Sequence, residues 1–183
     1  MRKLAMLASA AALLAGLWAI GTTFATAQVN SNDPRIALVD NCDPVTFTAA
    51  FGPGVCVSTP HKLDTPFAEF FALLSSPLSA AVVGHPAWRF DPGYVSIRAG
   101  QTVLATNTGG EGHTFTEVAA YGGGFVPFPP LNFGLATAPA CVPPPGTTIV
   151  APGQTSRITG LAPGVHKFQC CIHPWMRAVV DVE

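Results

Sequence analysis

The stretch VHKFQCCIHPWMRAVVDV, residues 165–182, contains two short strand-like segments, VHKFQC and RAVVDV, on either side of a loop rich in sulfur and imidazole. Side chains along a strand point alternately to opposite faces. Phe168 and Cys170 therefore share one face of the first segment, and Cys171 lies on the other. Because Phe168 should face the core, we expect Cys170 to point inward and Cys171 outward.

Cys170, His173 and Met176 follow the pattern C-x-x-H-x-x-M, which curls three possible metal ligands around one point. The same alternation in HTFTEV puts His113 on the inward face with Phe115. One thiolate, two imidazoles and a thioether form a set that prefers copper, with a trigonal His₂Cys plane and a weak axial methionine. The sequence therefore predicts one type 1 copper site, whose chemistry is electron transfer. Zinc is the alternative metal, but methionine is a poor zinc ligand.

Five further segments read as short strands separated by Gly- and Pro-containing turns: YVSIR, TVLATN, HTFTEV, TTIVA and TSRIT. With the two segments above, about seven short strands at roughly ten-residue spacing favour an antiparallel β-sandwich. Residues 121–146 are rich in glycine and proline, so we expect a long loop there rather than a central strand. The predicted fold class is all-β.

The first 27 residues have the features of a cleavable signal peptide. Basic residues at positions 2 and 3 precede an apolar run, and Ala25-Thr26-Ala27 provides a small-residue cleavage site. An N-terminal membrane anchor is the alternative. We expect cleavage after Ala27 and a periplasmic or secreted protein with no membrane anchor, since no cysteine stands at the cleavage point for a lipid.

The charge of the remaining chain is nearly balanced. Removing residues 1–27 leaves 7 of the 9 basic side chains against 10 acidic ones, a net charge of about −3 with histidines neutral. This balance favours neither nucleic acid nor an anionic membrane as a partner. About 156 residues remain, which is enough for one domain with a substantial core.

Residues 28–84 read as an N-terminal extension. Cys42 and Cys56 enclose a Pro/Gly-containing segment and should form a disulfide, which would stabilise the fold by about 3 kcal/mol. The segment LDTPFAEFFALLSS then predicts a short amphipathic helix with Asp64 or Thr65 as its N-cap. Its apolar stripe consists of Phe67, Phe70, Phe71 and Leu74.

Residues 85–183 resemble a cupredoxin domain, and the ligand loop CCIHPWM is most similar to that of amicyanin. The resemblance also rests on GEGHTF around His113 and on the upstream GQTVLATN. It implies a Greek-key β-sandwich of about eight strands with one type 1 copper. The ligands it implies are His113, Cys170, His173 and Met176.

Two features depart from the cupredoxin pattern. Many small blue copper proteins have asparagine after the first histidine ligand, whereas this chain has Thr114. We expect Thr114 and Asn107 to support the ligands through hydrogen bonds. The second departure is Cys171, for which a bridge to Cys141 would leave Cys170 as the unpaired thiolate. The alternative bridge between the adjacent cysteines 170 and 171 would strain disulfide geometry and destroy the site.

Three classes of function follow from the predicted site. The first is a one-electron carrier, whose redox partner protein would meet the edge of His173 through an apolar patch. The second is a copper-delivery protein without a carrier role, and the third is an oxidase or nitrite reductase. Gln169 and Cys171 flank Cys170, and there is no His-x-His pair, so the sites for further coppers typical of such enzymes are missing. We therefore predict a monomeric electron carrier that is not an enzyme. Three other histidines should be structural or exposed: His61, His85 and His166.

Overall fold

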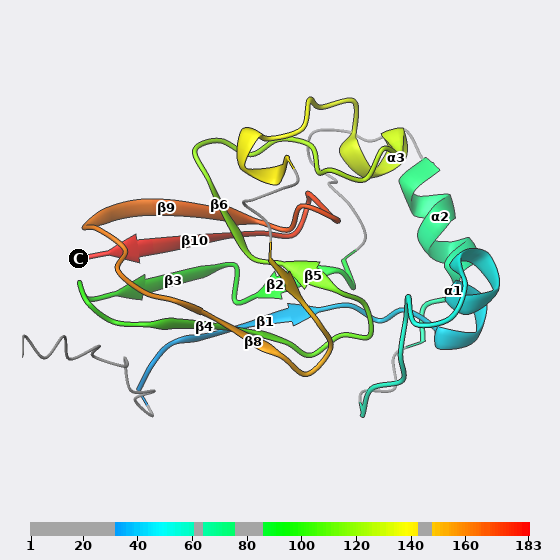
Figure 1. Ribbon diagram of the computed structural model, residues 1–183, viewed down its shortest axis with the longest axis horizontal. Helices are drawn as coiled ribbons and strands as arrows, with labels where there is room; N and C mark the ends of the chain where they lie inside the picture. Colours follow the sequence, from blue (N-terminus) through cyan, green and yellow to red (C-terminus); the bar gives the residue numbers. More distant parts are fainter. Residues whose placement is uncertain (1–31, 61–63, 76–85, 143–147) are drawn as a thin grey trace, which may run out of the picture.

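The computed structural model describes residues 32–60, 64–75, 86–142 and 148–183 (Figure 1). The predicted signal peptide, His61 and His85 lie outside these ranges, so their predictions stay untested. Within the described ranges, no helix has both the length and the apolar character needed to cross a bilayer.

Two four-stranded sheets form a β-sandwich, which confirms the predicted all-β fold class. The first sheet has the order β2 (Arg89–Asp91), β1 (Arg35–Val39), β4 (Val103–Asn107) and β8 (Thr155–Ile158). The second has the order β3 (Tyr94–Ile97), β10 (Arg177–Val182), β9 (Gly164–Gln169) and β6 (Thr116–Val118). A separate pair joins β5 (His113–Thr114) to β7 (Ile149–Val150). Two pairings, β1 with β4 and β3 with β10, are parallel, so the expectation of a wholly antiparallel sandwich is wrong.

Strand β1 lies within the segment that the sequence analysis placed in the extension. It pairs with β4 on one side and β2 on the other, and its Ile36 and Leu38 are fully buried. Neither β1 nor β2 was predicted, because a strand of three to five residues carries too little periodicity to stand out from its surroundings. The segment 28–84 therefore contributes a strand to the sandwich itself.

Two helices stand at one end of the sandwich, on the right in Figure 1, where the β9–β10 connection also lies. The predicted helix is present as α2 (Phe67–Ser75). The other helix, α1 (Pro44–Phe51), lies between the two cysteines where only a turn was expected. It begins there because Asp43 accepts hydrogen bonds from the backbone N–H groups of residues 45 and 46 and proline occupies the first turn.

The core of the sandwich continues into the space under these helices. Phe115 stacks on Phe168 between the sheets, with ring centroids 4.4 Å apart. Towards the helices, Trp88 packs between Phe47 of α1 and Phe70 of α2. Leu74 is buried as well, whereas Phe71 is 42% exposed and does not complete the predicted apolar stripe.

The long loop between β6 and β7 covers the outer face of β9. It contains α3 (Pro129–Asn132) and the 3₁₀ turn Pro139–Cys141. Gln169 and Cys171 point away from the sandwich core, as their parity predicts, yet both are fully buried beneath this loop. Alternation along a strand sets the face on which a side chain lies, but not whether another segment covers that face.

Candidate metal centre

The ligand loop, residues 170–176, connects β9 to β10 and is closed by its own backbone. The N–H of Cys170 donates to the carbonyl of Met176 at 3.0 Å, and the N–H of Met176 donates to the carbonyl of His173 at 2.9 Å. These bonds hold the three side chains at one end of the sandwich. Cys170 and Met176 are fully buried, and His173 is 4% exposed.

His113 reaches the same place from β5. Its Nδ1 lies 3.8 Å from Sγ of Cys170. The nearest ligand atoms of His113, Cys170 and His173 all lie within 4.8 Å of one another. The structure thus brings together two imidazoles and one thiol from segments about 57 residues apart. Met176 is buried in the same core cluster as Cys170.

The sulfur of Cys170 lies in surroundings that favour a thiolate. The backbone N–H groups of Thr114 and His173 both point at Sγ, each at 3.4 Å. Burial alone raises the pKa of a thiol, but hydrogen bonds and charge from the two histidines outweigh it and lower the pKa of Cys170 well below its ordinary value. Cys170 is also the one cysteine of the chain outside a disulfide.

The Nδ1 atom of His173 is a second feature, after the lowered pKa of Cys170, that fits a metal ligand. It is the one buried side-chain nitrogen or oxygen in the described part of the chain that has no hydrogen-bond partner. An unpaired buried polar atom costs about 1–3 kcal/mol, so it needs an explanation. A metal ion bound between His173, His113 and Cys170 would satisfy it, and the soft donor set fits copper.

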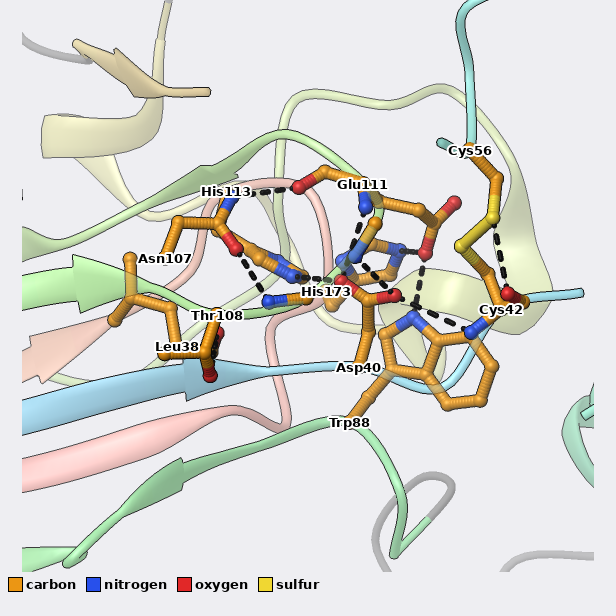
Figure 2. A network of polar contacts seen from close by, with 12 residues as sticks. Leu38, Asp40, Cys42, Cys56, Trp88, Asn107, Thr108, Glu111, His113 and His173 are labelled. Atoms are coloured by element: carbon orange, nitrogen blue, oxygen red, sulfur yellow. Dashed lines mark hydrogen bonds and ion pairs between the residues drawn. A yellow bond between two sulfur atoms is a disulfide. The ribbon is translucent and has the colours of Figure 1, made fainter. Parts of the chain in front are cut away.

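Asp40 holds the outer nitrogen of His113 (Figure 2). Its Oδ2 lies 2.8 Å from Nε2 of His113, and neither side chain is exposed to solvent. This contact orients the ring with Nδ1 facing Cys170. Burial lowers the pKa of His113, but its bonds to Asp40 and Cys170 outweigh that and raise the pKa to about 10. Burial raises the pKa of Asp40, but the His113 contact and backbone N–H donors leave it below its ordinary value.

Glu111 occupies the corresponding place beside His173. Its Oε2 lies 3.6 Å from Nε2 of His173 and accepts a hydrogen bond from the indole N–H of Trp88 at 2.5 Å (Figure 2). Burial raises the pKa of this carboxyl group, although the neighbouring histidine opposes that shift. Each imidazole is therefore backed by one buried carboxyl group, an arrangement that the sequence analysis did not predict.

The turn 108–112 approaches Asp40 closely because Gly109 and Gly110 have no side chain. The backbone N–H groups of Gly110 and Glu111 donate to Asp40, each at 3.0 Å. A Cβ atom at Gly109 would collide with the Asp40 side chain, and one at Gly110 would collide with the carbonyl of Val57. Glycine is therefore required at both positions by close approach of the backbone.

Thr114 and Asn107, the two residues predicted to support the ligands, make hydrogen bonds to segments next to the ligand residues. The hydroxyl of Thr114 accepts the N–H of Cys171 at 2.7 Å and so ties β5 to the ligand loop. Asn107 donates to the carbonyls of Glu111 and Val150 and accepts the N–H of Gly109. It therefore fixes the turn that leads to the first histidine.

Both predicted disulfides are present. Cys42 bonds to Cys56, and Cys141 bonds to Cys171 with Cα atoms 5.3 Å apart. The alternative bridge to Cys170 does not form. The second disulfide ties the long loop to the residue next to the candidate copper thiolate.

Phe70, Trp88 and Trp175 surround the ring of His173, with ring centroids 5.3–6.4 Å away, and the residue is 4% exposed. The expectation that a partner protein meets the edge of this ring stays a prediction. His166 lies outside the site, where its ring contacts Glu117 and the carbonyl of Ala162.

Asp40 was not predicted as part of the site because it lies 73 residues before His113. The pair Glu111-x-His113 was the only local signal for the other carboxyl group.

No protein-family model and no curated protein matches this sequence. Solved structures similar to the chain include a purple cupredoxin from Nitrosopumilus maritimus, at 15% identity and a TM-score of 0.43 over 82% of this chain and 100% of that one. They also include amicyanin from Paracoccus versutus (Thiobacillus versutus), at 24% identity and a TM-score of 0.36 over 61% and 88%. Both are of the family that the ligand loop resembles.

Proposed function

We propose that this protein is an exported type 1 copper protein that carries single electrons. The observation that carries the proposal is the buried cluster of His113, Cys170 and His173, with one nitrogen left unpaired and a thiol whose pKa is lowered. Met176, buried in the same loop, supplies the fourth soft donor.

Cys170 would hold copper through its thiolate, and His113 and His173 would complete the plane, with Met176 as the weak axial ligand. Copper in such a site supplies a one-electron Cu(I)/Cu(II) couple. The residues of this chain contribute the surroundings of that couple. Asp40 orients one imidazole, two backbone N–H groups fix the sulfur, and the loop bonds keep the ligands in place.

The burial of the ligands favours a carrier over a copper-delivery protein. A protein that hands copper to an acceptor must let that acceptor replace its ligands. Here three ligand side chains are fully buried and the fourth is 4% exposed. Exchange would require the end of the sandwich to open, whereas an electron can leave without any such movement.

Export is the second part of the proposal. Four cysteines are bridged, and disulfides of this kind persist in oxidising compartments such as the periplasm or the extracellular space. This agrees with the predicted cleavage after Ala27. We expect a redox partner protein to dock at the end where α1 and α2 cover His173, with Phe51 and Phe71 as its exposed apolar contacts.

The test is the visible spectrum of the purified protein with one equivalent of Cu(II), beside a Cys170→Ser variant. We expect an intense thiolate-to-copper band that the variant lacks. A second step separates the two candidate functions. Repeated reduction and reoxidation in the presence of a copper chelator should leave the band intact in a carrier. A missing band would refute the type 1 site, and loss of copper to the chelator would support delivery instead.

A further inference from the structure

A cavity of about 390 Å³ lies between helices α1 and α2 and the segment 126–131, next to the candidate metal centre. Its walls are apolar, and six of the residues that form them are phenylalanines. Phe47, Phe51, Phe67 and Phe70 come from the two helices. A volume of this size is typical of sites that hold small organic molecules.

Two polar groups reach this cavity, Glu111 and His173. Oε2 of Glu111 is already engaged by Trp88 and lies near His173. The other oxygen, Oε1, makes no hydrogen bond with the described part of the chain, and in Figure 2 it points away from both partners. The side chain is 10% exposed, and Oε1 is not fully buried, so this acceptor faces the cavity and water can bind it there.

This combination selects for one kind of ligand. Phenylalanine faces offer no hydrogen bonds to water but stack well on a planar ring. An acceptor beside them favours a ligand that brings its own N–H or O–H group, because a ligand that displaces the water on this oxygen without replacing its hydrogen bond loses affinity. Among the described residues, no lysine or arginine lines the cavity, so an anion would find no counter-charge from them.

We propose that the cavity binds a small aromatic molecule carrying a hydrogen-bond donor, a phenol or a benzylic amine. Its ring would pack among the phenylalanines, and its donor would bond to Oε1 of Glu111. Such a ligand would lie directly against the ring of His173. The binding itself does not depend on copper, so the proposal goes beyond the electron-carrier function and can fail or succeed separately.

The test is calorimetric titration of the copper-free protein, purified after expression of the full chain, with four probes of similar size: p-cresol, benzylamine, toluene and benzoate. We expect saturable binding of at least one of the two donor-bearing probes. Toluene should bind about tenfold more weakly, since it lacks the hydrogen bond, and benzoate should not bind. This comparison needs no variant. Binding of toluene as tight as that of p-cresol and benzylamine, or no saturable binding of either donor probe, would overturn the proposal.

A pair of variants locates the site. Val126→Trp would fill the cavity from the loop side and should abolish binding. Val165→Trp places the same side chain on β9, at a position that is 64% exposed and not part of the cavity, and should leave binding unchanged. Thermal unfolding of each variant confirms that it is folded. Equal binding by a folded Val126→Trp variant and by the wild type would show that the ligand binds elsewhere, which refutes the assignment.

Discussion

Replacing Asp40 by asparagine removes one buried acceptor while keeping the size of the side chain. The carboxylate accepts four hydrogen bonds: Cys42 and Gly110 donate to Oδ1, and Glu111 and His113 contact Oδ2. An amide has a single acceptor oxygen, so in either orientation its NH₂ group faces two donors. Each buried donor left without a partner costs about 1–3 kcal/mol. The free energy of unfolding should therefore fall by about 2–6 kcal/mol.

Urea unfolding of the copper-free protein at neutral pH measures this change, because without copper it reports folding alone. The matched control is Asp91→Asn, which makes the same chemical change in the exposed pair with Arg89. An exposed ion pair contributes about 0–1 kcal/mol, so the control should change little. Copper affinity, measured by competition with a chelator, should also fall about 10–100-fold for Asp40→Asn, because a neutral amide holds the His113 ring less firmly than the carboxylate does.

Equal stability losses in the two variants would refute the reasoning. Water could then accept the hydrogen bonds that Asp40 accepts in the wild type, and the burial of Asp40 beneath the turn 108–112 would contribute little to stability. A large loss of stability with unchanged copper affinity would separate the two effects: Asp40 would support the fold, and His113 would keep its orientation without it.

Three further predictions concern the surroundings of the site. Replacing Cys141 and Cys171 together by serine removes a disulfide that joins residues 30 positions apart, and should lower the free energy of unfolding by about 3–4 kcal/mol. The copper band should remain, and its loss would show that the disulfide positions the ligand loop. Gly109→Ala should destabilise the copper-free fold and weaken copper binding, because the new methyl group collides with the carboxylate of Asp40. Gly153→Ala is the control: its methyl group meets no other atom, but the positive φ is strained for alanine, so the variant should lose stability and keep its copper affinity. In copper-free protein, the pKa of His113 is raised to about 10 and that of Cys170 lies well below 9. Between about pH 6.5 and 9 the native pair therefore holds one proton, on His113, and the unfolded pair also holds one, on Cys170, so folding neither takes up nor releases a proton. The stability difference between the wild type and a variant that lacks both titrating groups, Cys170→Ser with His113→Gln, measured by urea unfolding, should be flat in that window. It should fall above about pH 9, where only the unfolded thiol loses its proton, and below about pH 6.5, where only the unfolded imidazole gains one. A steep slope between pH 7 and 8.5 would contradict the thiolate–imidazolium assignment.

The ligand loop could be predicted because its information is local. Cys170, His173 and Met176 lie within seven residues, and the parity of the preceding strand decides which of two adjacent sulfurs points inward. In the same way, His113 was predicted to face the core because it alternates with Phe115 in the segment HTFTEV. In the structure that segment forms two strands, β5 and β6, rather than one. Cysteine number was a further constraint, since an odd count leaves one sulfur unpaired.

The carboxyl groups behind the histidines could not be predicted in this way. Asp40 meets His113 only because β1 is inserted between β2 and β4, a pairing that no short-range pattern encodes. Glu111 faces His173 because a turn fixed by Asn107 presents it to the opposite loop. Both contacts join segments that are distant in the chain, and their geometry exists only once the sheets have packed.

Residue types and spacing along the chain were sufficient to predict the candidate copper ligands, most of the strands and the helix at residues 67–75. The packing of distant segments decided the rest. Strand β1 is inserted into a sheet, Phe70 of α2 packs against His173 together with Trp88 and Trp175, and α1 and α2 form a cavity beside it. The physical reason is that periodicity records which face of an element is apolar. What covers that face depends on contacts between segments far apart in sequence, and these are settled by shape and by the pairing of buried polar groups in the folded chain.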